Sequence, residues 1–207
     1  RQPLRVIVDS RLETPPSARI LPAPGAVLLY HAEDHPARRA ALEAAGAELA
    51  CLPGAAGIKV FMGSSTGNLL VDDPPSLEKI VAKLSRRASF HAEDEDRLKS
   101  RIHLRVPGDP SSHPVWRDEE AALMATKRLV AFAEKYRRRV HVLHISTAEE
   151  MDFLEHHKEW ASVEVTPHHL TLAAPECYER LGTYVQMNPP VRDARHRDRI
   201  WKALADG

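Results

Sequence analysis

The chain alternates short apolar runs with segments in which apolar residues recur at helical spacing. A short apolar run is typical of a buried strand, and recurrence every three or four residues is typical of a helix packed on one side. The runs predict strands at residues 4–8, 26–30, 48–52, 57–61, 88–91, 140–145 and 162–165. The amphipathic segments predict helices at residues 36–45, 76–84, 120–136, 148–157 and 195–204. This alternation indicates an α/β protein with parallel strands.

Proline and glycine interrupt the pattern at two places. Residues 106–114 contain three prolines and a glycine, and we predict a loop there. Residues 53–56, Pro-Gly-Ala-Ala, separate two predicted strands by very few residues. Successive parallel strands need a crossover of about a dozen residues or more, so this link allows only an antiparallel hairpin or a change of domain. We therefore predict that a segment of residues 1–54 joins a different protein part, residues 55–207.

Composition excludes several classes of partner. The 207 residues include 29 Lys and Arg and 29 Asp and Glu, so we expect no net field that attracts nucleic acid or membrane. No apolar run approaches the roughly 18 residues that span a bilayer. Only Cys51 and Cys177 are present, as is ordinary for a cytoplasmic protein. The first residue is not methionine and the last follows a predicted helix, so we expect both ends to be cut.

Candidate metal ligands occur in the predicted strands. Lys59 shares a strand face with Gly57 and Phe61 and is expected to point into the interior. A buried lysine is costly unless it is paired or neutralised. Lys59 therefore either extends to the strand end or reacts with CO2 to form a carbamate, a carboxylate-like group that can bridge two metals.

Two histidines lie at the ends of the next strands. His91 ends one run, and His144 ends another on the face of Val140 and Val142, whereas His141 has the opposite parity. A lone strand histidine is more often structural than a ligand, but ligand types at three successive strand ends favour a site. Active sites of parallel α/β barrels lie at the carboxyl ends of the strands. Lys59, His91 and His144 therefore predict a zinc-type metal site.

Two further motifs remain open to structural interpretations. For the adjacent His168 and His169 we favour a structural role over metal binding, because neighbours on a strand face opposite ways. Asn188, just before Pro189 and Pro190, either hydrogen-bonds an amide ring or caps a turn.

Six motifs together resemble bacterial dihydroorotase of the amidohydrolase superfamily. They are GIKVFMGSSTG (57–67), SFHAEDE (89–95), GDPSSHPVWRD (108–118), HVLHISTAEE (141–150), VEVTPHHLTL (163–172) and QMNPPVR (186–192). The resemblance implies a (β/α)8 TIM-type barrel, of which residues 55–207 supply central strands 4–7. It also implies a two-metal centre, usually zinc, that interconverts carbamoyl-aspartate and dihydroorotate in pyrimidine biosynthesis. By resemblance Lys59 is the carbamylated bridging lysine, His91 and His144 are ligands, and Asn188 contacts substrate.

Two departures from the family pattern concern the active site. The family has a His-x-His on its first strand, and no His-x-His occurs in these 207 residues. The family's general acid/base Asp comes on the eighth strand, and the chain stops at Gly207 before reaching it. We therefore expect one surviving half-site for a single zinc, no catalytic residue, and little or no turnover.

Residues 1–54 resemble a different family. Residues 3–12 (PLRVIVDSRL), 14–16 (TPP) and 18–19 (Ala-Arg) are similar to the reductase domain of the bifunctional riboflavin-biosynthesis deaminase/reductase. The resemblance implies a short βαβ-like piece of a dihydrofolate-reductase-like fold that uses NADPH. Glu13 stands where that family commonly has a second arginine, and the glycine-rich cofactor loop is absent, so we expect no reductase activity.

Three hypotheses follow for the whole chain. The first is a chimaeric or truncated dihydroorotase. The second is a non-catalytic chimaeric fold, and the third is a hydantoinase-like or allantoinase-like hydrolase. The wording of the motifs favours dihydroorotase over the third. Half a barrel also leaves unpaired edges at the strand of Lys59 and at the strand that ends near Val165, so we expect self-association.

Overall fold

The computed structural model describes residues 5–9, 13–18, 21, 27–30, 35–38, 41, 47–48, 58–65, 70–84 and 88–206. Its strands form two separate parallel sheets. The first contains β1 (Arg5–Val8), β2 (Val27–Tyr30) and β3 (Ala47–Glu48) in the order β1-β2-β3. Val27 and Leu29 of β2 are buried in a cluster with Leu21, and Ile7 and Ala18 pack against this cluster.

The second sheet contains four strands in chain order. They are β4 (Ile58–Phe61), β5 (Ala88–His91), β6 (Val140–Val142) and β7 (Ala161–Val163). Each pairs in parallel with the next, so β4 and β7 are the two edges of this sheet. The predicted parallel α/β architecture is confirmed.

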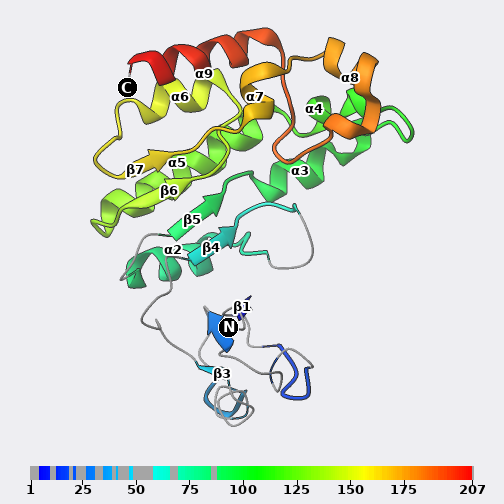
Figure 1. Ribbon diagram of the computed structural model, residues 1–207. Coiled ribbons are helices and arrows are strands. Elements are labelled where there is room, and N and C mark those ends of the chain that lie inside the picture. The colour runs from blue at the N-terminus through cyan, green and yellow to red at the C-terminus, as the bar shows by residue number, and fades with distance from the viewer. Residues whose placement is uncertain are drawn as a thin grey trace.

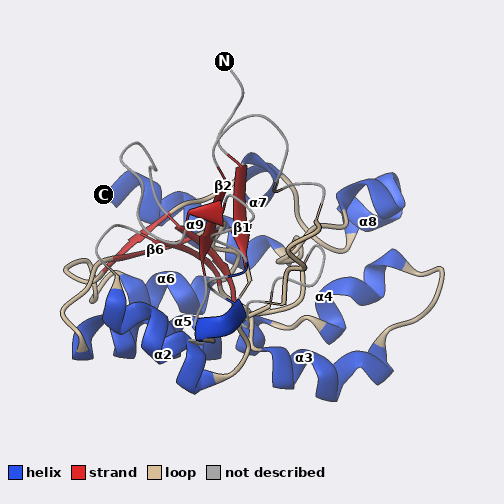
Figure 2. Cartoon of the chain, turned by 90° about the horizontal axis from the view of Figure 1, so that it is seen from below, coloured by secondary structure: helices blue, strands red, loops and turns tan. Residues whose placement is uncertain are grey.

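Helices cover one face of this second sheet. They are α2 (Pro74–Lys83), α5 (Glu119–Lys135) and α6 (Ala148–Leu154), and both views place them on the same side of the curved strands (Figures 1 and 2). Every second strand residue faces them: Val60, Phe90 and Val142 are buried in one cluster with helix residues. The remaining strand positions, which include Lys59 and Ser89, therefore lie on the opposite face.

Local capping explains where these helices begin. The side chains of Asp73, Asp94, Asp118 and Thr147 each accept a hydrogen bond from a backbone N–H three residues later. Such caps satisfy N–H groups that the first helical turn leaves without a partner. The predicted helix at 120–136 consequently begins at Glu119, directly after its cap.

Several short helices were not predicted. They are α3 (Glu95–Arg101), η1 (Ile102–Leu104), η2 (Pro110–Ser112), α4 (His113–Trp116), α7 (Pro167–Thr171), α8 (Glu176–Leu181) and η3 (Gly182–Val185). The prediction of a loop at 106–114 is wrong over its second half. Pro110 and Pro114 stand at the first positions of helical turns, where a missing N–H costs nothing.

The C-terminal helix α9 (Ala194–Asp206) packs on α6 and α7. No helix in the described part of the chain is both long and apolar enough to cross a membrane. β3 and β4 belong to different sheets, which agrees with a change of sheet rather than a hairpin between them. The predicted junction at 53–56, Cys51 and most of the predicted helix at 36–45 lie outside the described residues.

Candidate metal centre

Lys59 lies on the sheet face that the helices do not cover. In the register of β4 and β5, Lys59 is opposite Ser89 and Phe61 is opposite His91. The Lys59 Nζ lies 4.5 Å from the centre of the Phe61 ring. Burial lowers the pKa of Lys59 to about 8, although the charge of Glu164 acts in the opposite direction. The lysine is therefore half-buried at the interior-facing position that its parity predicted.

His91 and His144 meet at the ends of neighbouring strands. Nδ1 of His91 lies 3.0 Å from Nε2 of His144, and the rings are nearly perpendicular, at 74°. His91 is only 1% exposed. Burial, followed by the nearby His91 and Lys59, lowers the pKa of His144 to about 3. His144 is therefore neutral at ordinary pH, which is the form of imidazole that binds metals.

The predicted facing of His144 is wrong. Parity placed it with Val140 and Val142, which are buried against the helices. β6 ends at Val142, and His144 has a φ of 41°, in the left-handed region that few residues other than glycine adopt. Strand alternation no longer applies there, and the ring turns toward His91. His141 instead lies 2.9 Å from Ser162 Oγ, through its Nδ1.

The histidine pair fits a zinc-type ion. Two imidazole nitrogens bound tetrahedrally at about 2.0–2.1 Å from zinc stand roughly 3.3 Å apart, close to the observed 3.0 Å. Both histidines also carry a second buried ring nitrogen, His91 Nε2 and His144 Nδ1, that makes no regular hydrogen bond. Within the described ranges no group of three or more His, Cys, Asp or Glu assembles a metal site. The donors present are therefore two imidazoles, with Lys59 on the adjoining strand.

A buried ion pair borders His91. Oε2 of Glu93 lies 3.0 Å from Nε2 of His91, off the line of a regular hydrogen bond. Arg117 binds both oxygens of Glu93, through Nε at 3.1 Å and through a shorter contact from its terminal nitrogen. Burial raises the pKa of Glu93. The contacts with His91 and Arg117 together outweigh burial and lower the pKa to about 2. The carboxylate of Glu93 is therefore ionised in the interior, where it pairs with Arg117.

Asn188 does not contact the histidine pair. Its Oδ1 lies 3.1 Å from Nε2 of His113, which is also 3.1 Å from the backbone oxygen of Met187. Asn188 therefore fixes the segment before α9 against α4. Its predicted contact with substrate stays a prediction.

His169 has two internal partners. Its Nδ1 lies 3.0 Å from Thr166 Oγ1, and its Nε2 lies 3.2 Å from the backbone oxygen of Pro189. Burial lowers the pKa of His169 to about 4. His168 is exposed. The two contacts support the structural role predicted for His169. Both histidines lie in α7 and not on a strand, so the strand alternation used to predict that role does not apply to them.

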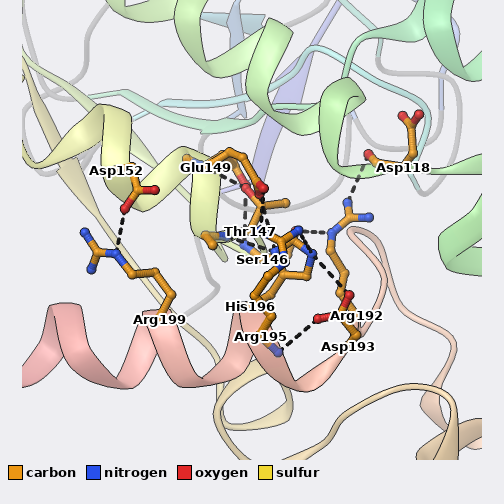
Figure 3. Close-up of polar contacts among 12 residues, drawn as sticks. Asp118, Ser146, Thr147, Glu149, Asp152, Arg192, Asp193, Arg195, His196 and Arg199 are labelled. Atoms are coloured by element: carbon orange, nitrogen blue, oxygen red, sulfur yellow. Dashed lines mark hydrogen bonds and ion pairs between the residues drawn. The ribbon is translucent and has the colours of Figure 1, made fainter.

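Sequence reasoning missed Glu93, Arg117 and Arg192. Arg192 is buried and donates to Ser146 Oγ at 3.2 Å and to the backbone oxygens of Arg117 and Asp118 at 2.8 and 3.2 Å. Figure 3 shows it between Asp118 and the loop of Ser146, just after His144. The available signal was weak: each of the three is a charged residue inside one of the quoted motifs.

Comparisons with known proteins bear on these motifs. No protein-family model matches the chain. The dihydroorotase of Halobacterium salinarum is 32% identical over 151 residues, which are 72% of this chain and 35% of that protein. The chain is a partial homologue of the dihydroorotases. It spans about a third of the length of the curated relatives that it matches.

Two similar proteins with other names are also cyclic amidohydrolases. The allantoinase of Streptomyces avermitilis is 33% identical over 168 residues, 74% of this chain and 36% of that protein. The crystal structure of dihydropyrimidinase from Brevibacillus agri superposes with a TM-score of 0.69 at 25% identity, covering 88% of this chain and 41% of that one. The fold of this chain therefore matches part of an amidohydrolase barrel. The reductase resemblance of residues 1–54 and a chimaeric origin stay predictions.

Proposed function

We propose that the dihydroorotase-like part of this chain carries one half of a metal centre for opening a cyclic amide. The observation that carries the proposal is the approach of His91 to His144 at 3.0 Å, on neighbouring strand ends. Relatives named dihydroorotase and allantoinase match the chain over about 70% of its length. The proposed setting is the cytoplasm, and the proposed substrate pair is dihydroorotate and carbamoyl-aspartate.

The protein residues have distinct proposed roles. His91 and His144 each offer an uncharged imidazole nitrogen to the metal. Lys59 would join them as a carbamate, formed when its amine nitrogen adds to the carbon of CO2 and loses one proton. A zinc ion held there would act as a Lewis acid and supply hydroxide for attack on the amide carbon. Asn188 is the proposed contact for the substrate ring.

We propose little or no turnover by this chain alone. The 207 residues contain no His-x-His to hold a second metal. A general acid/base contributes about 10²–10⁴-fold to a rate, and the loss of metal ligands should cost more. Hydrolysis of dihydroorotate with zinc and bicarbonate present should stay at background. Saturable turnover that Lys59→Ala abolishes would show that the half-site works alone.

Metal binding tests the proposed half-site directly. We expect Co²⁺ to bind the full chain with a stoichiometry near one, measured by calorimetry and visible absorption. His91→Ala and His144→Ala should each abolish binding. His141→Ala is the matched control, because His141 lies on β6, just before His144, but contacts Ser162. Retained binding in both ligand variants would refute the assignment.

A second candidate function concerns the substrate. The allantoinase relative and the dihydropyrimidinase fold match favour a hydantoin-like or ureide ring as an alternative. Saturation-transfer NMR on the Co²⁺-free, zinc-loaded chain can compare dihydroorotate, allantoin and hydantoin. Binding of dihydroorotate alone supports the dihydroorotase reading. Binding of none of the three supports a non-catalytic fold.

We also propose that the chain associates with itself. Among the described residues β4 and β7 are the edges of the second sheet, and Leu70 pairs with β4 only at Phe61. A strand edge presents unpaired N–H and C=O groups to other strands. Light scattering should detect oligomers at micromolar concentration. A monodisperse monomer with a single cooperative melt would argue against exposed edges.

A further inference from the structure

The loop after β4 packs closely against the segment that follows His91. A Cβ atom added to Gly63 would come within 2.5 Å of the backbone oxygen of Glu93, so no side chain fits there. Ser64 donates from its backbone N and its Oγ to the two carboxylate oxygens of Glu95, both at 2.7 Å. The ends of the strands that carry Lys59 and His91 are therefore fixed to each other.

Glu93 is the centre of this arrangement. Its carboxylate is fully buried and is shared by Arg117, through both oxygens, and by Nε2 of His91 at 3.0 Å. Arg117 also donates to the backbone oxygen of Ser64 at 2.6 Å. A buried carboxylate with an arginine on one side and an imidazole on the other has little freedom to move.

The position of Glu93 determines where the His91 proton is most stable. An ionised carboxylate only accepts hydrogen bonds, and a neutral imidazole has one N–H and one bare nitrogen. At 3.0 Å the carboxylate attracts a proton on Nε2, even with an angle poorer than that of a regular hydrogen bond. Nδ1 of His91 is then bare and faces Nε2 of His144. A bare nitrogen is the form that a metal requires.

We propose that Glu93, held by Arg117, is a positioning residue that keeps the proton of His91 on Nε2 and thereby leaves Nδ1 free for a metal ion. The proposal rests on the proposed metal half-site. Glu93 is not itself a metal ligand in this proposal; it acts on the metal through the proton of His91. Arg192 continues this hydrogen-bond network, since it donates to the backbone oxygen of Arg117 and to the side chain of Ser146, two residues after His144.

The substitution Glu93→Gln should reverse the tautomer. Arg117 offers only donors, so the amide oxygen of a glutamine would turn toward it and the amide NH2 would turn toward His91. Nε2 of His91 would then have to accept, and its proton would move to Nδ1. A metal ion competing with that proton should bind about 10–100-fold more weakly.

The tautomer is measured by long-range ¹H–¹⁵N NMR of the histidine rings in the full, metal-free chain. His91 signals are assigned by their loss in His91→Gln. We expect the Nε2–H form in the wild type and the Nδ1–H form in Glu93→Gln. A purely structural role for Glu93 would not move this signal. An Nδ1–H form in the wild type would overturn the proposal, even if the variant failed to fold.

Co²⁺ affinity provides the second readout. Glu78→Gln is the matched control, because Glu78 lies on α2 and binds Lys135 and Tyr136 at the end of α5 instead of a histidine. We expect Glu78→Gln to bind like the wild type and Glu93→Gln to bind about 10–100-fold more weakly. Equal affinity in all three chains would overturn only the role of Glu93. Absence of binding in the wild type would overturn the metal half-site and this inference with it.

Discussion

The two sheets of the molecule differ in the apolar clusters and in the buried charged residues that accompany them. In the described residues, the sheet of β1–β3 is accompanied by a small cluster around Leu21, Val27 and Leu29. The sheet of β4–β7 shares one apolar cluster with α2, α5, α6 and α9. It also carries the buried charges of Glu93, Arg117 and Arg192. Among the described residues, the buried charged side chains all lie in the second region, and a functional site requires such groups.

Core substitutions should separate the two regions most strongly. Phe90 is fully buried at the centre of the second sheet, and Phe90→Ala should lower the free energy of unfolding by about 3–5 kcal/mol. All three tryptophans, Trp116, Trp160 and Trp201, lie in the second region, so their fluorescence in urea reports on it alone. The fluorescence midpoint should fall clearly in Phe90→Ala.

Leu29→Ala is the control for this comparison. Leu29 is 1% exposed in the first region, and the two apolar clusters share no residue. The substitution should leave the tryptophan transition unchanged. A matching fall in that transition would show that the two sheets unfold as one unit.

The sequence predicted the parallel order of the strands that carry or precede the candidate ligands. A parallel βα arrangement brings the ends of successive strands to one edge, and His91 and His144 meet there. The ligand roles of Lys59, His91 and His144 stay predictions. The facing of His144 was not predictable in this way, because the chain leaves strand geometry two residues earlier. Regular alternation holds only as long as the backbone stays extended.

The buried charges could not be predicted from the sequence, for a different reason. Glu93 and Arg117 are 24 residues apart, and Arg192 binds the backbone of Arg117 from 75 residues away. Nothing in a local pattern distinguishes them from the other charged residues of the same motifs. Burial and pairing depend on how separate segments pack, so these residues become visible only in the folded chain.

Acid should destabilise the second region through His169. Burial lowers its pKa in the folded chain to about 4 from the ordinary histidine value of 6.5. A depressed folded pKa means that the stabilisation is fully present above pH 6.5 and is lost as the pH falls toward 4. The loss should amount to roughly 3 kcal/mol, measured as the change in urea unfolding free energy between pH 7 and pH 4.

Two variants isolate this effect. In His169→Gln, which has no charge to gain, the decline between pH 7 and pH 4 should be smaller than in the wild type. His168→Gln is the matched control, since the neighbouring ring is exposed and should leave the wild-type decline intact. Identical declines in all three chains would assign the acid sensitivity to other groups.

The smallest expected effect concerns a helix cap in the second region. Asp73 precedes α2, and its Oδ1 accepts a hydrogen bond from Ser76 N at 2.8 Å. Asp73→Ala leaves that N–H to water and should lower the free energy of unfolding by about 1 kcal/mol, seen in the tryptophan-detected urea transition. Asp73→Ser keeps an accepting oxygen and should recover most of the loss. A cap acts locally, so the Co²⁺ affinity of Asp73→Ala should equal that of the wild type. If the affinity fell as well, the start of α2 would be coupled to the histidine pair, and the cap would affect both stability and metal binding.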